Sequence, residues 1–104
     1  MNEEQKIREL SYLRNQKENP TSGNYRRYMV NTYNYILQNS NAGNMGWSKA
    51  NTREMLNFVY EGTPDHMGYE MVEKFKKTLR DLGYIKTVKE ENEWRTYILK
   101  ELDF

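Results

Sequence analysis

The side chains best suited to chemistry are few in this sequence. His66 is the only histidine, and it directly follows Asp65. A histidine beside a carboxylate can transfer protons or bind a metal, but it needs a nucleophile or further ligands close by. Neither accompanies it at a suitable spacing. We therefore interpret this pair as the start of a helix.

Other catalytic arrangements are also missing from the pattern. The chain has no cysteine, which excludes thiolate nucleophiles, thiolate metal sites and disulfides. Gly43 and Gly46 neither follow a strand nor open a lysine-bearing helix, so they do not form a phosphate-binding loop. Carboxylates are plentiful, but none is paired in the apolar setting that acid catalysis needs. We expect a protein that is not an enzyme and has no cofactor or metal.

The composition predicts one small domain in the cytoplasm. With 104 residues, 37% hydrophobic and 30% charged, the core must be modest. Nine tyrosines and two tryptophans can enlarge it, because their rings bury a large area. The first residues are charged and no apolar run approaches 18 residues, so we expect no signal peptide and no membrane span.

Helical spacing marks two segments in the first half. Residues 3–18 carry a narrow apolar stripe, and the segment 18–23 with Pro20 breaks the pattern. Residues 24–39 form a broader helix that is rich in tyrosine. These rings either build the core or offer a stacking platform for unpaired bases. Most of them coincide with the apolar face, which favours the core.

The second half predicts a short edge strand at 46–48, two helices and a hairpin. The spacing of Asn51 and Glu54 is that of a helix cap. The last helix, 65–82, buries one face and ends at Gly83, where a left-handed residue is usual. Strands are expected over 84–89 and 93–100, joined by a turn at 90–92.

This order of elements resembles the winged helix-turn-helix family, and the best match is VEKFKKTLRDLGYIKTVKEENEWRTYIL. The resemblance implies an α+β, mainly helical fold: a winged helix-turn-helix domain over 24–104 with a C-terminal two-stranded wing, preceded by an additional N-terminal helix within 1–19. In that family the helix corresponding to 65–82 usually enters the DNA major groove, and the wing touches the backbone or minor groove.

The charge distribution agrees with an anionic partner for the second half. The whole chain has a net charge of +1, whereas residues 74–100 carry eight basic and four acidic side chains. The resemblance implies that this chain is a small transcription regulator or replication accessory protein that binds duplex or single-stranded DNA. Its predicted contacts are Arg26, Arg27, His66, Lys74, Lys77, Arg80, Lys86, Lys89 and Arg95.

Other acidic residues favour a second hypothesis. Glu70 and Glu73 lie on the outward face of the 65–82 helix, where DNA phosphates would repel them. They are also spaced to pair with Lys74 and Lys77 one turn later. The alternative is an adaptor or inhibitor of the phage or mobile-element type that docks on a larger polymerase, helicase or nuclease. Its predicted contacts are Ile7, Leu10, Leu13, Tyr28 and Tyr35.

The N-terminal helix has two candidate docking surfaces. Its stripe is too narrow to bury the helix on all sides and too apolar to leave in water. It can lie on the flank of its own domain, or on a second molecule or partner. Exchange between two copies would give a symmetric homodimer.

Overall fold

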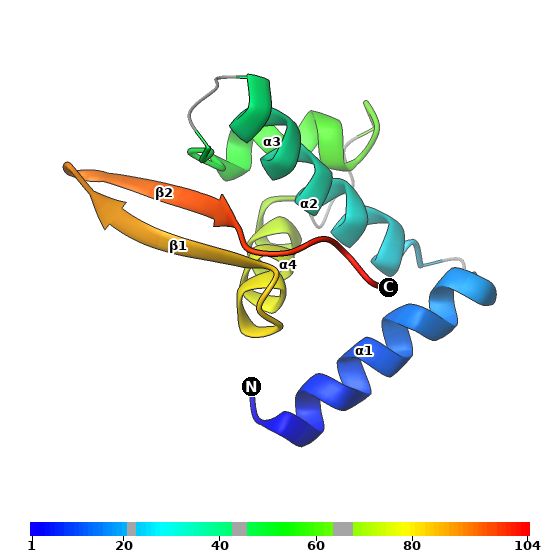
Figure 1. Cartoon of the computed structure of the whole chain (residues 1–104). Helices are drawn as coiled ribbons and strands as arrows, with labels where there is room; N and C mark the ends of the chain where they lie inside the picture. The colour runs from blue at the N-terminus through cyan, green and yellow to red at the C-terminus, as the bar shows by residue number, and fades with distance from the viewer. Residues whose placement is uncertain (21–22, 43–45, 64–67) are drawn as a thin grey trace.

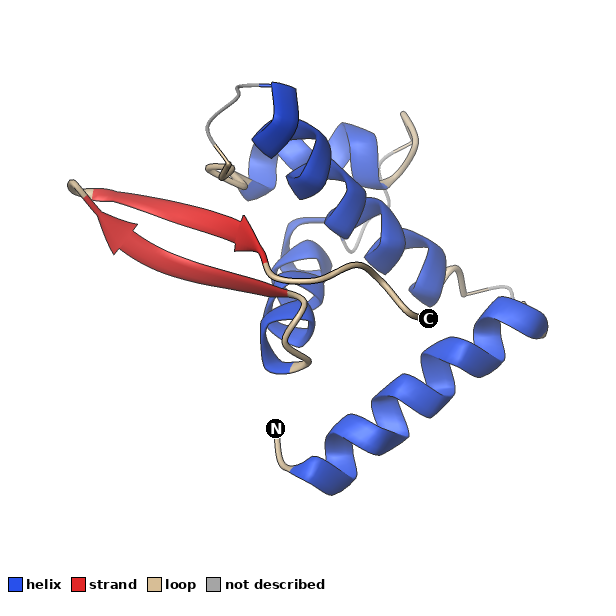
Figure 2. Cartoon of the chain, viewed as in Figure 1, coloured by secondary structure: helices blue, strands red, loops and turns tan. Residues whose placement is uncertain are grey.

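The computed structural model describes the chain except residues 21–22, 43–45 and 64–67 (Figure 1). The described residues form a mainly helical α+β fold, which confirms the predicted class (Figure 2). The elements are α1 (Glu3–Glu18), α2 (Tyr25–Ala42), α3 (Thr52–Val59), α4 (Gly68–Asp81), β1 (Ile85–Glu90) and β2 (Glu93–Ile98).

The N-terminal helix α1 is well capped but shallowly docked. The Asn2 side chain accepts a hydrogen bond from the Gln5 N–H, and the Gln5 side chain accepts one from the Asn2 N–H. Leu13 and Gln16 are its buried residues, whereas Ile7 is 61% exposed. In Figure 1, α1 lies beside the N-terminal end of α2, away from the hairpin. The helix therefore docks on its own chain through its second half.

The core lies where α2, α3 and α4 meet. Its fully buried side chains include Met29 and Ile36 from α2, Met55 from α3, and Phe75 and Leu79 from α4. The two residues of α2 are seven positions apart and the two of α4 are four apart, so in each of these helices they share one face, which turns inwards. The hydrophobic effect of burying these faces holds the three helices together.

The tyrosines of α2 build the core and its rim, as their position on the apolar face predicted. Tyr33 is buried, and its hydroxyl donates to the Lys100 carbonyl at 2.9 Å. The half-buried rings pack edge-to-face on rings in or directly after other helices; the pairs are Tyr25–Phe75, Tyr28–Tyr60 and Tyr35–Phe58. The packing of these rings on other parts of the fold agrees with the core-building interpretation, whereas stacking on bases stays untested.

Helix α4 ends as the sequence predicted, at a left-handed glycine. Gly83 has φ +85°, its N–H bonds the Arg80 carbonyl at 3.0 Å, and the Tyr84 N–H bonds the Leu79 carbonyl at 3.0 Å. These two bonds satisfy carbonyls at the helix end and reverse the chain. Tyr84 and Ile85 are then buried, which anchors the start of the hairpin on the core.

The hairpin is a regular antiparallel ribbon. Ile85 pairs with Ile98 at its base and Glu90 with Glu93 at its tip. The turn residues Glu91 and Asn92 have φ +49° and +65°, which suits the right-handed twist of a two-residue hairpin. The predicted edge strand is present as one bridge: Ser48 and Thr96 exchange backbone hydrogen bonds of 2.9 and 2.8 Å.

After β2, residues 99–104 run back over the helices and fasten the two ends of the fold. Phe104 is buried edge-to-face against Tyr84, whose hydroxyl bonds Asp103. The Arg14 guanidinium of α1 reaches the Asp103 carbonyl at 3.4 Å and its carboxylate at 3.7 Å. Arg26 of α2 donates to the Phe104 carbonyl at 3.0 Å. This segment therefore joins α1 and α2 to the start of the hairpin.

Candidate nucleic-acid interface

The outward face of α4 carries two exposed lysines. Lys74 makes no hydrogen bond or ion pair with any described residue, so its ammonium group is free for an anion. Lys77 Nζ lies 2.8 Å from the Asp81 carboxylate, and this hydrogen bond lowers the pKa of Asp81. Arg80 is half-buried on the same helix. An anion approaching α4 therefore meets one free and one paired ammonium group.

The predicted ion pairs one turn apart on α4 are wrong. Glu73 instead accepts a hydrogen bond from the Thr52 hydroxyl at 2.9 Å, and Lys77 pairs in the other direction with Asp81. Thr52 is the first residue of α3, which packs against this flank of α4. Glu73 therefore bonds a residue outside its own helix. Glu70 and Lys74 are both exposed and not paired with each other. Sequence spacing could not show this competition between partners.

Lys76 also joins this flank to the start of α3. Its ammonium group donates to the Ala50 carbonyl at 2.7 Å and to the Thr52 hydroxyl at 3.1 Å. Burial lowers the pKa of Lys76 because the charged form loses water there. Lys76 therefore positions α3 against α4, and its charge is not on the outward face.

Three cations of the hairpin region stack on aromatic rings. Lys86 Nζ lies 5.4 Å from the centre of the Tyr97 ring, and Lys89 Nζ lies 5.9 Å from that of Trp94. The Arg95 guanidinium lies 4.4 Å from the centre of the Trp47 ring. Such contacts hold a cation in place while leaving part of its charge accessible.

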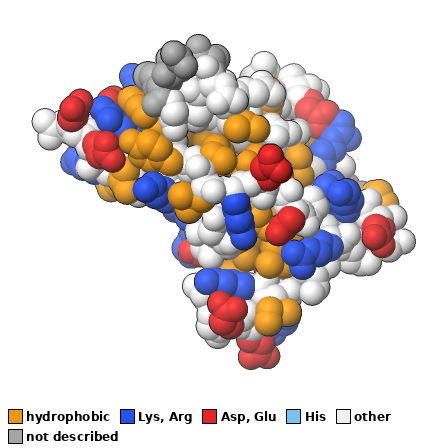
Figure 3. Space-filling model, in the orientation of Figure 1, with side chains coloured by type: hydrophobic (Ala, Val, Ile, Leu, Met, Phe, Trp, Pro, Cys, Tyr) orange, Lys and Arg blue, Asp and Glu red, His pale blue; other side chains and the backbone are white. Residues whose placement is uncertain are grey.

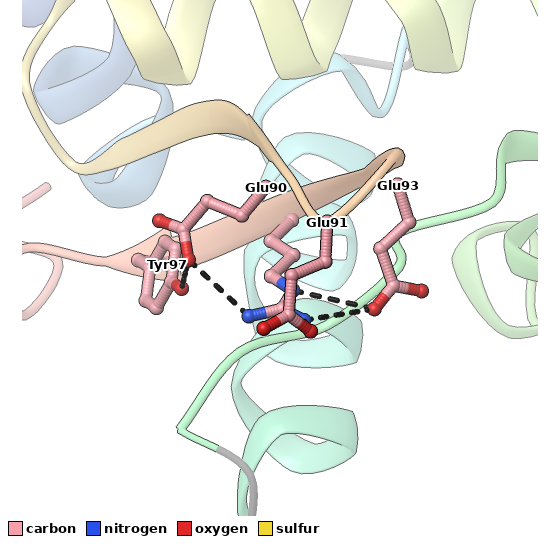
Figure 4. A network of polar contacts seen from close by, with 5 residues as sticks. Glu90, Glu91, Glu93 and Tyr97 are labelled. Atoms are coloured by element: carbon pink, nitrogen blue, oxygen red, sulfur yellow. Dashed lines mark hydrogen bonds and ion pairs between the residues drawn. The ribbon is translucent and has the colours of Figure 1, made fainter.

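Arg95 is engaged further by three carboxylates at the hairpin tip (Figure 4). Its side chain lies 3.2 Å from Glu90, 3.1 Å from Glu91 and 3.1 Å from Glu93, and it is only 15% exposed. The Tyr97 hydroxyl donates to the same Glu90 carboxylate at 3.3 Å. These acidic residues therefore organise the tip around Arg95, and the tip keeps a surplus of negative charge.

The pleat of the hairpin separates this network from Trp94. Residues that face each other across the ribbon share a side, so Trp94 and Lys89 lie on the side of Ile85 and Ile98. Arg95 lies on the opposite side, as do Glu90 and Glu93. Because Ile85 is buried in the core, the Trp94 side is the one turned towards the helices.

Arg26 and Arg27 serve intramolecular contacts on α2. The backbone N–H of Arg26 donates to the Gln16 side chain at 3.0 Å, and its guanidinium binds the Phe104 carbonyl. Arg27 pairs with Glu61, whose pKa this hydrogen bond lowers. His66 lies outside the described residues. The structure thus leaves the exposed lysines of α4 and the hairpin as the candidate interface: Lys74, Lys77, Lys86 and Lys89.

The predicted partner-binding residues do not form one surface. Leu13 is buried, Leu10 is half-buried and Ile7 is exposed, while Tyr28 and Tyr35 pack against other rings. The largest exposed apolar side chains include Ile7 at 61%, Trp94 at 59% and Leu99 at 51%. Sequence reasoning did not single out Trp94. Its position directly after the predicted turn, at the end of the hairpin away from the helices (Figure 1), was the signal that could have drawn attention to it.

A groove of about 580 Å³ separates the first half of α1 from α4. Its lining is mostly polar and includes Gln5, Arg8, Tyr12, Lys77 and Asp81. The described residues include no group of three or more acidic or histidine side chains that could hold a metal. None of the helices in the described part of the chain is long and apolar enough to span a membrane.

The space-filling view of Figure 3 shows acidic and basic side chains interspersed over this face of the molecule. An anionic partner therefore has no broad field to follow here and must recognise local groups. Comparison with known protein families, curated proteins and solved structures gives no match.

Proposed function

We propose that this chain is a small non-enzymatic winged-helix protein that binds DNA, as a transcription regulator or replication accessory factor. The observation that carries the proposal is the layout of the second half. Helices α2, α3 and α4 precede a hairpin whose β2 edge pairs with Ser48, so a short strand between two helices joins the wing. In this layout α4 is the helix that would enter the major groove.

The charges on α4 and the hairpin support a phosphate-binding role. Lys74 is free, and Lys77 can exchange Asp81 for a phosphate. Lys86 and Lys89 stand on the wing with rings behind them. In this proposal the lysines bind phosphates and position α4, while sequence is read by other contacts to base edges.

The proposal is tested by removing two charges from α4. We expect Lys74→Ala with Lys77→Ala to weaken duplex binding and to reduce the slope of log K against log salt by up to about 2, roughly one per lost phosphate contact. Binding is measured by fluorescence anisotropy with a labelled random-sequence duplex between about 50 and 200 mM salt.

The matched control is Lys6→Ala with Lys17→Ala on α1. It removes the same charge from one paired and one unpaired lysine, since Lys6 lies 3.7 Å from Glu3. This control should leave the salt slope unchanged. An equal loss in both double variants would show that only net charge matters, and no binding to any duplex or single strand at about 50 mM salt would refute the proposal.

A second candidate function is a protein adaptor or inhibitor that docks on a nucleic-acid enzyme. The acidic Arg95 side of the hairpin tip favours it, because Glu91 is 84% exposed there and phosphates would avoid that side. Exposed Ile7 on α1 would add an apolar contact. If the binding experiments fail, co-purification from the native host at low and moderate salt, followed by reconstitution with the purified partner, tests this candidate.

A further inference from the structure

Trp94 is a large aromatic side chain that the fold leaves mostly exposed. Its side chain is 59% exposed near the tip of the ribbon, and it has no ring partner among the described residues. An indole gains stability mainly by burying its large ring, and this one leaves most of that area in water. Its charged neighbour is Lys89, whose ammonium group lies over the ring.

The surroundings of Trp94 suit an anionic ligand with a flat ring. The three tip carboxylates bind Arg95, and Glu90 and Glu93 extend from the side of the ribbon opposite Trp94. On its own side the next pair is Thr87 with Thr96, whose hydroxyls bond each other at 3.1 Å. This side of the tip therefore combines an aromatic face, a lysine and neutral side chains.

We propose that Trp94 stacks on an unpaired base of single-stranded DNA while Lys89 binds a neighbouring phosphate. The inference deepens the proposed function and rests on it. Aromatic rings beside positive charge are the usual means of holding single strands, because every base has a face that can stack. Paired bases inside a duplex are already stacked on their neighbours, so the ligand of this site is an unpaired strand.

The first test follows the fluorescence of Trp94 itself. The chain has two tryptophans, so Trp47→Phe leaves Trp94 as the sole reporter. We expect a thymidine oligonucleotide of about 12 nucleotides, within the usual site sizes, to quench its emission as it binds. An abasic oligonucleotide of the same length has the same phosphates without bases, so it should bind more weakly and leave the emission unchanged.

The second test measures affinity in the otherwise unchanged chain. We expect Trp94→Ala to weaken binding of the thymidine oligonucleotide by about 5- to 150-fold, since one stacked base contributes about 1–3 kcal/mol. Leu99→Ala is the matched control, because it removes another exposed apolar side chain of the same region and should change affinity less than 2-fold. Thermal unfolding of each variant checks that the fold is intact.

The outcomes separate this inference from the function on which it rests. Equal binding of thymidine and abasic strands, with unchanged Trp94 emission, would overturn stacking. If the double variant Lys74→Ala with Lys77→Ala still weakened duplex binding in that case, the proposed function would be supported although the inference about Trp94 had failed. If neither the duplex nor the thymidine oligonucleotide bound, both proposals would be overturned.

Discussion

Replacing Gly83 tests whether the junction between α4 and the hairpin depends on backbone conformation. Gly83 has φ +85°, and a Cβ added there would have no atom within 4 Å apart from its chain neighbours. The cost of a substitution therefore comes from the left-handed backbone and not from a clash. We expect Gly83→Ala to lower the free energy of unfolding by about 1–2 kcal/mol.

The size of the effect should follow the side chain's tolerance of that conformation. Gly83→Asn should cost less than Gly83→Ala, because asparagine visits the left-handed region more readily. Gly83→Val should cost more than about 1 kcal/mol, because a β-branched residue resists positive φ. With a urea slope near 2 kcal/mol per molar, Gly83→Ala should lower the unfolding midpoint by about 0.5–1 M.

Gly68→Ala provides the matched control. Gly68 opens α4 without a left-handed backbone, and a Cβ there also meets open space. The same change should therefore stabilise the protein by up to about 1 kcal/mol, because alanine favours the helix. An unchanged midpoint for Gly83→Ala, or a larger loss for Gly83→Asn than for Gly83→Val, would refute this explanation of the helix end.

Three further predictions concern α1, the hairpin tip and a buried tyrosine. Leu13→Ala should cost about 2–5 kcal/mol because Leu13 is fully buried, whereas Ile7→Ala should change stability by less than about 0.5 kcal/mol in urea titrations. Arg95→Ala should lower the melting temperature because three carboxylates lose their shared cation, and added salt should restore part of the loss. Burial and the Asp103 hydrogen bond raise the pKa of Tyr84. The stability that Tyr84 contributes to the fold is therefore present below about pH 10 and is lost as pH rises through the folded-state pKa. Tyr84→Phe should thus lose less stability than the native chain between pH 8 and 11 in urea titrations, and an equal loss would contradict this.

The elements of this fold were predictable because local signals agree with the packing. The helix predicted over 3–18 is α1, the glycine expected to end the last helix is left-handed, and the hairpin turn falls within the predicted residues. The packing of residues 99–104 was not predicted. Its contacts depend on α1 and α2, which are remote in sequence, and no periodic pattern marks such a segment.

The candidate interface was less predictable because a charge in a sequence does not reveal its partner. Lys74 is free and Arg95 is held by three carboxylates, yet both are simply basic residues in the sequence. Arg26 binds a backbone carbonyl 78 positions away. Only the three-dimensional arrangement separates cations that hold the fold from those available to a ligand.

The contact between Arg14 and Asp103 also sets an order of events during synthesis. These residues are 89 positions apart, so the ribosome makes α1 well before the segment that fastens it. At about 5–20 residues per second, that interval is roughly 4–18 s. An isolated helix of 16 residues is marginal in water, so during those seconds α1 relies on its contacts with α2, such as the Tyr25–Glu9 and Arg26–Gln16 hydrogen bonds. The nascent chain should therefore be open to proteases and chaperones at this helix until residues 99–104 have left the ribosome.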